Sequence, residues 1–348
     1  MPPLSLDLGS QDRYAASNQM KAQGMEMARF TRRSVVAGVM LAPLVARAQS
    51  WPSGPIRIIV PYPAGGSVDA VARLAQSGLQ QRLGVTIVIE NRSGAGGSTG
   101  STLVAKAAPD GNTWLLVFDN HAVNPALLPN FPFDNQQDLE PVTLIGTAPY
   151  LVATNPAKPF KSLADIIAAA KKTPGTISYA SVGSGSIGHL AMVLLSKRAG
   201  IQLTHVPYRG GAPALNDALA GHVDLVNGSA ALLTSHIAAG KLRALWQHGA
   251  QRLPAHPTVP TVSEGGYKEA EAYAWWGTYA PAKTPKEIID RFRNALVESL
   301  RETKSARMLT ESQQMSLLLT PPEALRKFEL EQTRIWGAVV RENGIKGD

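Results

Sequence analysis

The chain has 348 residues, of which 44% are hydrophobic and 17% charged, and this balance excludes extensive disorder and fits about two globular domains. It contains no cysteine, which excludes a disulfide framework, a thiol nucleophile and a zinc–thiolate site. The net charge is +8, but no stripe of Lys and Arg alternates with aromatic residues, so we expect no nucleic-acid partner.

The N-terminal region has the features of a signal peptide. An apolar run at 35–45 follows three arginines and precedes Ala46-Arg47-Ala48, which has the small-x-small form of a signal-peptidase site. The run is too short to span a membrane, and no later run reaches the roughly 18 apolar residues that a spanning helix needs. We therefore predict that residues 1–48 are removed near Ala48 and that the mature protein is periplasmic.

Two details of this region stay open. Arg32-Arg33 is compatible with twin-arginine export as well as with ordinary secretion, and residues 1–24 are long and polar for such a segment, so that Met25 or Met27 is an alternative start. Removal of the first 48 residues takes away six basic and three acidic side chains and leaves a net charge of +5. A mildly basic protein of this kind favours anionic ligands.

The mature chain begins with a strand, a glycine loop and a helix. The β-branched run Ile56–Val60 predicts a strand, Gly65-Gly66 opens a turn, and the apolar spacing after Ser67 predicts a helix. Such a loop directs backbone N–H groups and a helix N-terminus at one place, which suits an anion. The pattern continues with a strand at 85–89, a glycine loop at 91–98, a helix at 102–108 and a strand at 113–118. Strands that alternate with helices in this way predict right-handed βαβ units and a parallel sheet.

The same order of elements returns about 115 residues later. It predicts a strand at 176–181, a glycine loop at 183–186, a helix at 187–199, a strand at 202–206, a helix at 213–220 and a strand at 223–226. We infer an α/β protein of two doubly wound lobes. The apolar stretch Pro141–Asn155 and the stretch Tyr273–Ala280 are the predicted crossings, and they form a two-strand hinge. A helix after Pro285 is expected to pack on the first lobe, so lobe 1 comprises 49–150 plus 275–348 and lobe 2 comprises 151–274.

The candidate ligand site is formed by loops at the carboxyl ends of these strands, where backbone N–H groups and polar side chains meet. Arg209 can fork onto a carboxylate or hold its own loop, and the same holds for Arg92. Asp119 can receive an ammonium or hydroxyl group, and Tyr62 and Tyr208 can wall the cleft. The predicted ligand-binding residues are Tyr62, Ala64, Gly65, Gly66, Ser67, Asp69, Asp119, Asn120, Ser181, Gly183, Ser184, Gly185, Ser186, Tyr208, Arg209 and Asn227.

Catalytic and cofactor chemistry find little support in the sequence. Residues 183–188 match G-x-G-x-x-G, but no acidic residue follows about 20 positions on, where a dinucleotide ribose would need one. The seven histidines show no metal-ligand spacing, and there is no G-x-S-x-G motif. We predict no catalytic residues, no cofactor and no metal, while an NAD-dependent oxidoreductase or a periplasmic hydrolase stays as the rival class.

A series of short motifs resembles one family of transport receptors. In order, the motifs are Tyr62-Pro63-Ala64-Gly65-Gly66 with Asp69 and Arg73, Asn91-Arg92 before Gly94-Ala95-Gly96-Gly97, Pro109-Asp110-Gly111, Asn124-Pro125, Pro132-Phe133-Asp134, Lys172-Thr173-Pro174-Gly175, His205-Val206-Pro207-Tyr208, Gly221 with Val223-Asp224, Gly240-Lys241-Leu242-Arg243-Ala244, Pro260-Thr261-Val262 with Glu264 and Gly266, and Trp276-Gly277. Over nearly all of the mature chain, the sequence resembles the Bug (TctC-like) solute receptors of tripartite tricarboxylate transport systems.

The resemblance implies a type II periplasmic binding fold whose two lobes close on a ligand. It implies a small carboxylate ligand (a dicarboxylate, an amino acid or an aromatic acid), delivery to membrane permease subunits and a monomeric receptor, in which the loops matching 62–69 and 181–186 hold the carboxylate. Ser93 and the Phe118-Asp119-Asn120 run depart from the family pattern, and the second departure puts the ligand's identity in doubt. A receptor that signals to a sensor protein instead of feeding a permease is the alternative.

Overall fold

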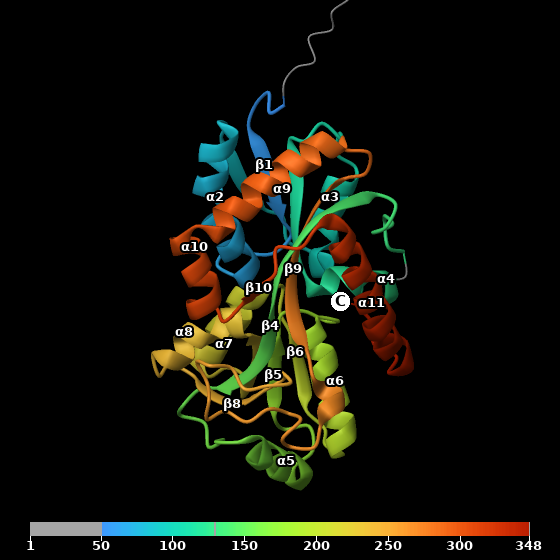
Figure 1. Cartoon of the computed structure of the whole chain (residues 1–348). Coiled ribbons are helices and arrows are strands. Elements are labelled where there is room, and N and C mark those ends of the chain that lie inside the picture. The colour runs from blue at the N-terminus through green and yellow to red at the C-terminus, as the bar shows by residue number, and fades with distance from the viewer. Residues whose placement is uncertain (1–50, 129, 348) are drawn as a thin grey trace, which may run out of the picture. The chain divides into compact units, whose positions relative to one another are not determined.

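The computed structural model describes residues 51–128 and 130–347, so the predicted signal peptide lies outside the described residues. Strands and helices alternate over most of this range (Figure 1). The strands are β1 (Ile56–Val60), β2 (Ile87–Asn91), β3 (Thr113–Phe118), β4 (Leu139–Thr154), β5 (Ser178–Ser181), β6 (Thr204–Pro207), β7 (Leu225–Ser229), β8 (Arg243–Gln247), β9 (Tyr273–Pro281) and β10 (Ser316–Leu317). The helices are α2 (Ser67–Leu83), α3 (Ser98–Ala105), α4 (Asn124–Leu127), α5 (Leu163–Lys172), α6 (Ile187–Ala199), α7 (Gly211–Ala220), α8 (Ala230–Ala238), α9 (Lys286–Arg301), α10 (Thr303–Arg307) and α11 (Pro322–Glu342).

The strands form one continuous path in the order β2-β1-β3-β9-β4-β7-β5-β6, with β8 and β10 also paired to β4. Within it, β1 is parallel to β2 and β3, and β5 is parallel to β6 and β7, as the alternation of strands and helices predicted. The long strand β4 joins these two parallel sets. We call β1, β2, β3, β9 and residues 139–149 of β4 the first strand group, and we call β5–β8 and residues 150–154 of β4 the second strand group.

The change from one group to the other occurs within a single residue step of β4. Pro149 pairs with Tyr273 of β9, whereas Tyr150 pairs with Ser229 of β7. Tyr150 also accepts a backbone hydrogen bond from His248, which follows β8. Figure 1 shows β4 and β9 side by side along the middle, and β9 is antiparallel to β4 throughout. Two strands thus connect the groups, at the places where the apolar stretches predicted crossings.

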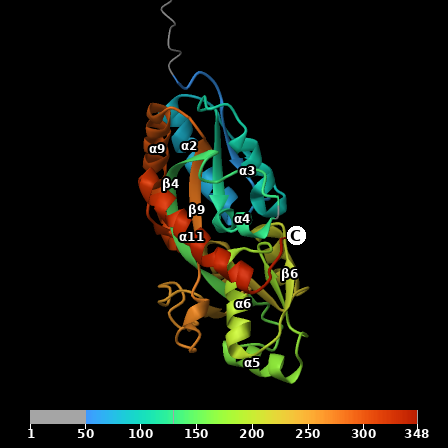
Figure 2. The same cartoon turned by 90° about the vertical axis from the view of Figure 1, so that its right-hand side faces the viewer.

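Helices cover both strand groups. On the first group, α9 lies against α2, and the ring of Trp114 in β3 stacks on Phe292 of α9 at 3.7 Å between centroids. Gly78 of α2 allows this close packing, because a Cβ there would lie 2.7 Å from Ser299. Figure 2 shows α11 running alongside β4 and β9, and this helix contacts both α4 and α6. In the described part of the chain, no helix is both long and apolar enough to cross a membrane.

The predicted helix at 187–199 and the predicted strand at 113–118 are confirmed residue for residue. The predicted helix at 102–108 is wrong at both ends, because α3 runs from Ser98 to Ala105 and includes Gly100. This helical position requires glycine, because a Cβ at Gly100 would lie 2.8 Å from the Arg92 carbonyl oxygen and from Pro61. The glycine therefore permits a close approach of two chain segments and does not mark a loop.

Candidate functional site

Three helices begin at one small cavity, which we call the inner cavity. Its volume is about 20 Å³, which is room for a single water molecule. The starts of α2, α7 and α8 all contribute to its wall. The lining residues are Tyr62, Gly66, Ser67, Val68, Phe118, Val182, Gly210, Gly211, Ser229 and Leu232.

The start of α2 is held in place by Asp69 and has backbone donors to spare. Asp69 accepts hydrogen bonds from the Gly65 backbone N–H at 3.0 Å, from Arg73 Nε at 2.9 Å and from Asn91 Nδ2 at 3.1 Å. Burial alone would raise the pKa of Asp69, but these bonds outweigh it and hold the pKa below its ordinary value. The backbone N–H groups of Ser67 and Val68 have no acceptor among residues 51–128 and 130–347. They therefore remain available to an anion.

The starts of α7 and α8 resemble that of α2. Gly210 and Ser229, the residues before these helices, make no side-chain capping hydrogen bond. Gly210 has φ 144°, a conformation that favours glycine, and a Cβ there would lie 2.8 Å from Pro63 of the first loop. Since the positive end of each helix dipole and its unpaired N–H groups face the same cavity, the arrangement favours a negative charge there.

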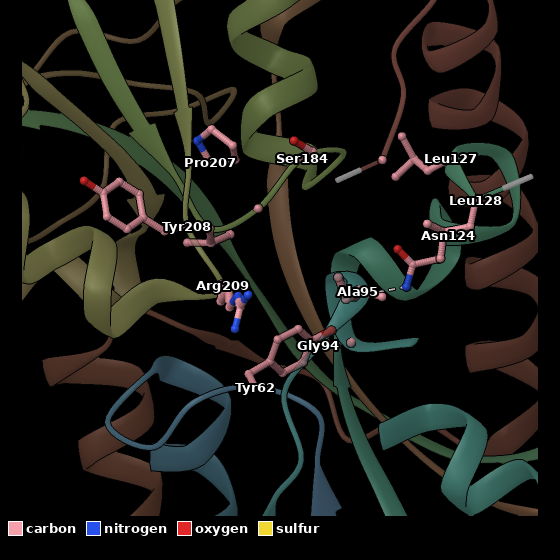
Figure 3. Close-up of a pocket in the computed structure, with 15 residues that line it drawn as sticks. Tyr62, Gly94, Ala95, Asn124, Leu127, Leu128, Ser184, Pro207, Tyr208 and Arg209 are labelled. Carbon is pink, nitrogen blue, oxygen red and sulfur yellow. Dashed lines mark hydrogen bonds between the residues drawn. The ribbon is translucent and has the colours of Figure 1, made fainter. Parts of the chain in front are cut away.

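A larger pocket of about 450 Å³, the outer pocket, shares Tyr62 and Val182 with the inner cavity (Figure 3). One wall comes from the 94–97 glycine loop and from α4 with Leu128, and the other comes from residues after β5 and β6. The lining residues are Tyr62, Gly94, Ala95, Gly96, Gly97, Asn124, Leu127, Leu128, Val182, Gly183, Ser184, Pro207, Tyr208, Arg209 and Gly347. Leucine side chains and backbone polar groups thus share this wall, which suits a ligand with an apolar body and polar ends.

Arg209 is the cation of the outer pocket. It is exposed, and no hydrogen bond or ion pair joins its guanidinium to another described residue. Tyr208 contributes mainly its backbone, because its ring is directed away from the pocket in Figure 3 and its hydroxyl donates to Asp217 Oδ2 at 2.5 Å. Arg92, the matching arginine of the first strand group, is outside the pocket and pairs with Glu90 at 3.0 Å.

The glycine loop before α6 differs from the sequence expectation. The loop at 181–186 was expected to hold the ligand's carboxylate, but the Gly185 N–H donates to His189 Nδ1 at 3.0 Å, and the His189 N–H donates to Ser186 Oγ at 3.3 Å. The Ile187 N–H points to Asp119 Oδ1 at 3.5 Å. Side chains of the protein therefore occupy the start of α6, and its N–H groups are not available to an anion in this structure.

The polar side chains predicted at the site lie mostly behind the loops. Asn120 accepts a hydrogen bond from the Tyr62 hydroxyl at 2.6 Å and donates to the Gly96 carbonyl at 2.6 Å. Asn227 donates to the Gly188 carbonyl at 2.7 Å, and Ser181 Oγ lies 2.7 Å from His205 Nε2. These contacts hold the loops that form the walls of both cavities.

The structure gathers part of the predicted set around the two cavities. Tyr62, Gly183, Ser184, Tyr208 and Arg209 line the outer pocket, and Tyr62, Gly66 and Ser67 line the inner cavity. Ala64 and Gly65 are exposed on the first loop, and a Cβ at Gly65 would lie 3.7 Å from Ala212 of α7. The remaining predicted residues, Asp69, Asp119, Asn120, Ser181, Gly185, Ser186 and Asn227, line neither cavity.

Sequence reasoning missed several lining residues. The 94–97 loop was recognised as glycine-rich but was not included in the site, although Gly94, Ala95, Gly96 and Gly97 all have positive φ angles. Leu127 and Leu128 carry no sequence signal that separates them from core leucines. Gly347 reaches the pocket because its N–H donates to the Leu127 carbonyl at 3.3 Å.

The two strand groups touch across the site. A Cβ on Gly185 would lie 1.9 Å from Leu127 Cδ1, so a side chain there would require Leu127 of α4 to move. The Tyr150 hydroxyl donates to Asp119 Oδ2 at 2.6 Å, at the point where β4 changes groups. Within the residues that the structure describes, no cluster of three or more His, Asp or Glu side chains is arranged to hold a metal ion.

Comparison with known proteins places this geometry in a family. Residues 71–345 match the model of the tripartite tricarboxylate transporter family receptors, TctC. The periplasmic binding protein BugD is 32% identical, with a TM-score of 0.81 over 86% of this chain and 100% of that one. Rpa4515 of R. palustris, solved with adipate, is 29% identical, with a TM-score of 0.80 over 85% of this chain and 99% of that one.

A third solved structure is MatC (Rpa3494) from Rhodopseudomonas palustris with bound malate. It is 29% identical to this chain, with a TM-score of 0.79 over 83% of this chain and 100% of that one. These similarities confirm the predicted α/β periplasmic binding protein fold. The family is one of transport receptors, not of enzymes. The chain belongs to the TctC family of tripartite tricarboxylate transporter receptors.

Proposed function

We propose that this protein is an exported receptor that binds a small carboxylate and delivers it to membrane permease subunits. The main support for this proposal is the inner cavity, where α2, α7 and α8 begin without a side-chain capping hydrogen bond. A helix start stabilises an anion by ~0.3–1 kcal/mol, or up to ~2 when partly buried, and each charge-assisted hydrogen bond adds ~1.5–3 kcal/mol. Three such starts with their N–H groups can provide the ~8 kcal/mol of a micromolar complex.

The ligand's carboxylate lies at the inner cavity in this proposal, and its body extends into the outer pocket. The predicted set at 62–69, 181–186 and 208–209 would surround it, with Asp119, Asn120 and Asn227 as predicted contacts that lie behind these loops. The relatives solved with adipate and malate support a carboxylate as the ligand class. A cavity with room for a single water molecule does not admit a carboxylate, so in this proposal the two strand groups separate to admit the ligand and close around it.

The moving parts in the proposal are the predicted lobes, 49–150 plus 275–348 and 151–274. The strands β4 and β9 would form the hinge between them. The change of partners between Pro149 and Tyr150 supports a boundary at this place. A monomer with one site is the simplest receptor of this design. Small-angle scattering with and without ligand would show a smaller radius of gyration in the complex, and an unchanged radius would contradict the hinge.

The binding test is calorimetry against a panel of carboxylic acids that includes adipate and malate, with the corresponding diamides as neutral controls. We expect saturable, micromolar or tighter binding of at least one acid and none of its amide. Gly66→Val adds bulk at the inner cavity and should weaken binding at least tenfold, whereas Gly54→Val, at a site with no neighbour within 4 Å, should not. Binding of the amide as tightly as the acid would exclude an anion site.

Export is tested separately. The full-length chain should be found in the periplasmic fraction, and N-terminal sequencing should show a mature protein that begins just after Ala48. A chain that keeps residues 1–48 in the cytoplasm would contradict the localisation without affecting the binding site. Crosslinking to permease subunits in the native host would distinguish transport from the signalling alternative.

A further inference from the structure

The side chain of His189 holds the loop before α6 from within the second strand group. His189 is the third residue of α6, and its Nδ1 accepts a hydrogen bond from the Gly185 N–H at 3.0 Å. Its own N–H donates to Ser186 Oγ at 3.3 Å, so two reciprocal bonds close the helix start. A Cβ on Gly185 would meet Leu127 of the first strand group. His189 therefore acts on the loop at the place where the two strand groups touch.

The same arrangement occurs at the start of α2 with a different acceptor. Asp69 is the third residue of α2, and it accepts the N–H of Gly65, four residues earlier, at 3.0 Å. Gly65 has φ 82° and Gly185 has φ 75°, so in both loops a glycine in the left-handed region donates to the third residue of the following helix. His189 is thus the counterpart of Asp69. The recurrence of this bond at both loops favours a role in shaping the site over a role in helix capping alone.

The ring of His189 is held in orientation and stays neutral. It stacks on His205 of β6, with 3.8 Å between centroids and 7° between planes, and His205 stacks in turn on Tyr179 of β5 at 5.0 Å. His205 Nε2 also lies 2.7 Å from the Oγ of Ser181, the residue at which β5 ends. Burial and, to a smaller extent, His205 lower the pKa of His189 to about 3. Its Nδ1 therefore remains an acceptor at neutral pH, and the ring proton is on Nε2.

We propose that His189 is a positioning residue for ligand binding, whose Nδ1 fixes the glycine loop so that residues 182–184 form a wall of the outer pocket. This inference rests on the proposed function, in which the ligand's body extends into that pocket. Val182, Gly183 and Ser184 line the pocket, and Val182 also lines the inner cavity. His189 lines neither cavity, so it acts only through the loop.

Preorganisation is the physical reason for this role. Gly183 and Gly185 both have positive φ angles, and glycine reaches many other conformations at little cost. A ligand that had to restrict such a loop would bind more weakly, because ordering the loop costs conformational entropy. The bond from Gly185 to a stacked ring restricts the loop before the ligand arrives. Loss of the acceptor should therefore weaken binding without removing any group that touches the ligand.

The test compares three substitutions of His189 by calorimetry with the acid that the wild-type protein binds. His189→Leu removes the acceptor and should weaken binding at least tenfold. In His189→Asn the acceptor oxygen is bonded to Cγ, as Nδ1 is in histidine, so the affinity should stay within threefold of the wild-type value. In His189→Gln the acceptor lies one bond further out, and binding should weaken as in His189→Leu. The asparagine and glutamine variants decide the test if His189→Leu fails to fold.

A merely structural role would give the opposite order of these two variants. Glutamine is the better helix former, so stability alone favours His189→Gln, whereas positioning favours His189→Asn. NMR of the histidine rings gives a second readout, since His189 should show the Nε2–H tautomer at pH 7. Equal affinities of the two amide variants, or an Nδ1–H tautomer, would overturn the role of His189 while leaving the carboxylate receptor intact.

His248→Leu is the matched control. His248 is also a buried histidine whose ring nitrogen accepts an N–H, from Trp246 Nε1 at 3.2 Å, but it lines neither cavity. Its substitution should lower the stability and leave the affinity at the wild-type value. A loss of affinity as large as that of His189→Leu would overturn the inference, because any buried histidine would then have this effect. Failure of the wild-type protein to bind any acid of the panel would overturn the proposed function and this inference with it.

Discussion

The starts of α2 and α6 follow similar glycine-containing loops, but their backbone N–H groups are open at α2 and hydrogen-bonded at α6. Each follows a parallel strand and a loop with two glycines. At α2, Asp69 accepts a hydrogen bond from the Gly65 N–H of the loop, and the N–H groups of Ser67 and Val68 have no acceptor among the described residues. At α6, the N–H groups of the loop and first turn donate to Ser186, His189 and Asp119. One helix start therefore has open N–H groups for a ligand, while the other is already in contact with a carboxyl group of the protein.

This difference shows that a glycine loop before a helix indicates where an anion can bind, but not whether the place is free. The deciding residue at α6 is Asp119, which lies 68 positions earlier in the chain and belongs to the other strand group. A helix start gives the same favourable field to a carboxylate of the protein as to one of a ligand. Whether it is open depends on the tertiary structure.

The strongest test of the open start is to prevent closure around it. Gly210→Ala places a Cβ 2.8 Å from Pro63, across the inner cavity from α2, and it requires a positive φ that alanine disfavours. We expect carboxylate affinity to fall about 100-fold, or about 2.7 kcal/mol, because the strand groups can no longer meet. Calorimetry with the acid bound by the wild-type protein measures this.

Gly200→Ala is its matched control. Gly200 ends α6 with φ 62° and has no described neighbour within 4 Å, so alanine there also brings backbone strain, milder than at Gly210, without a contact across the site. Its stability should fall slightly while its affinity stays at the wild-type value. Equal losses of affinity in the two variants would mean that strain, and not closure, controls binding.

The filled start is tested by Tyr150→Phe. This change removes the hydroxyl that donates to Asp119 Oδ2 at 2.6 Å and leaves a buried carboxylate with one hydrogen bond fewer. We expect the free energy of unfolding to fall by about 2 kcal/mol, within the ~1–3 kcal/mol cost of an unpaired buried group. Urea unfolding measures the change. Tyr208→Phe removes a hydroxyl with a half-buried partner, Asp217, and should cost far less. A loss at Tyr150 no larger than at Tyr208 would show that Asp119 does not depend on this bond.

Much of the fold could be predicted from the sequence, because apolar periodicity and glycine or proline punctuation are local signals. The helix 187–199 and the strand 113–118 were placed correctly for this reason. The error at α3 has the same origin, since Gly100 was interpreted locally although its cause is the distant Pro61. The predicted site succeeded where ligand-facing groups belong to one loop, as at Gly66 and Ser67.

The rest of the site could not be predicted because it depends on contacts between distant segments. The junction of α7 and α8 with α2 requires the strand order, which no local pattern gives. Leu127 is a pocket residue only because α4 lies against Gly185. Asp119 was chosen as a possible ligand contact, and its bond to the start of α6 appears only in three dimensions.

Glu329 is a buried carboxyl that, unlike Asp119, contacts no helix start, and its ionisation makes the stability of the protein depend on pH. Burial raises the pKa of Glu329 from its ordinary value of 4.5 to about 7. Between these pH values the folded protein holds a proton that the unfolded chain has lost. Raising the pH therefore lowers the free energy of unfolding by up to about 1.4 kcal/mol per pH unit. The Glu329→Gln variant should lose this contribution. Thermal unfolding of both proteins between pH 4.5 and 7 measures it, and parallel curves would show that Glu329 is ionised in the fold.

The smallest expected effect concerns Arg209, the exposed cation that lines the outer pocket. Arg209→Gln should weaken carboxylate binding only two- to fivefold at low salt and less at high salt, because solvent and ions screen an exposed charge. Calorimetry at two ionic strengths measures this, and Arg92→Gln, which removes an arginine paired with Glu90 outside the pocket, is the control. A loss as large as that of Gly210→Ala would contradict the comparison drawn here, since it would make a side chain, and not the open helix starts, the main partner of the ligand.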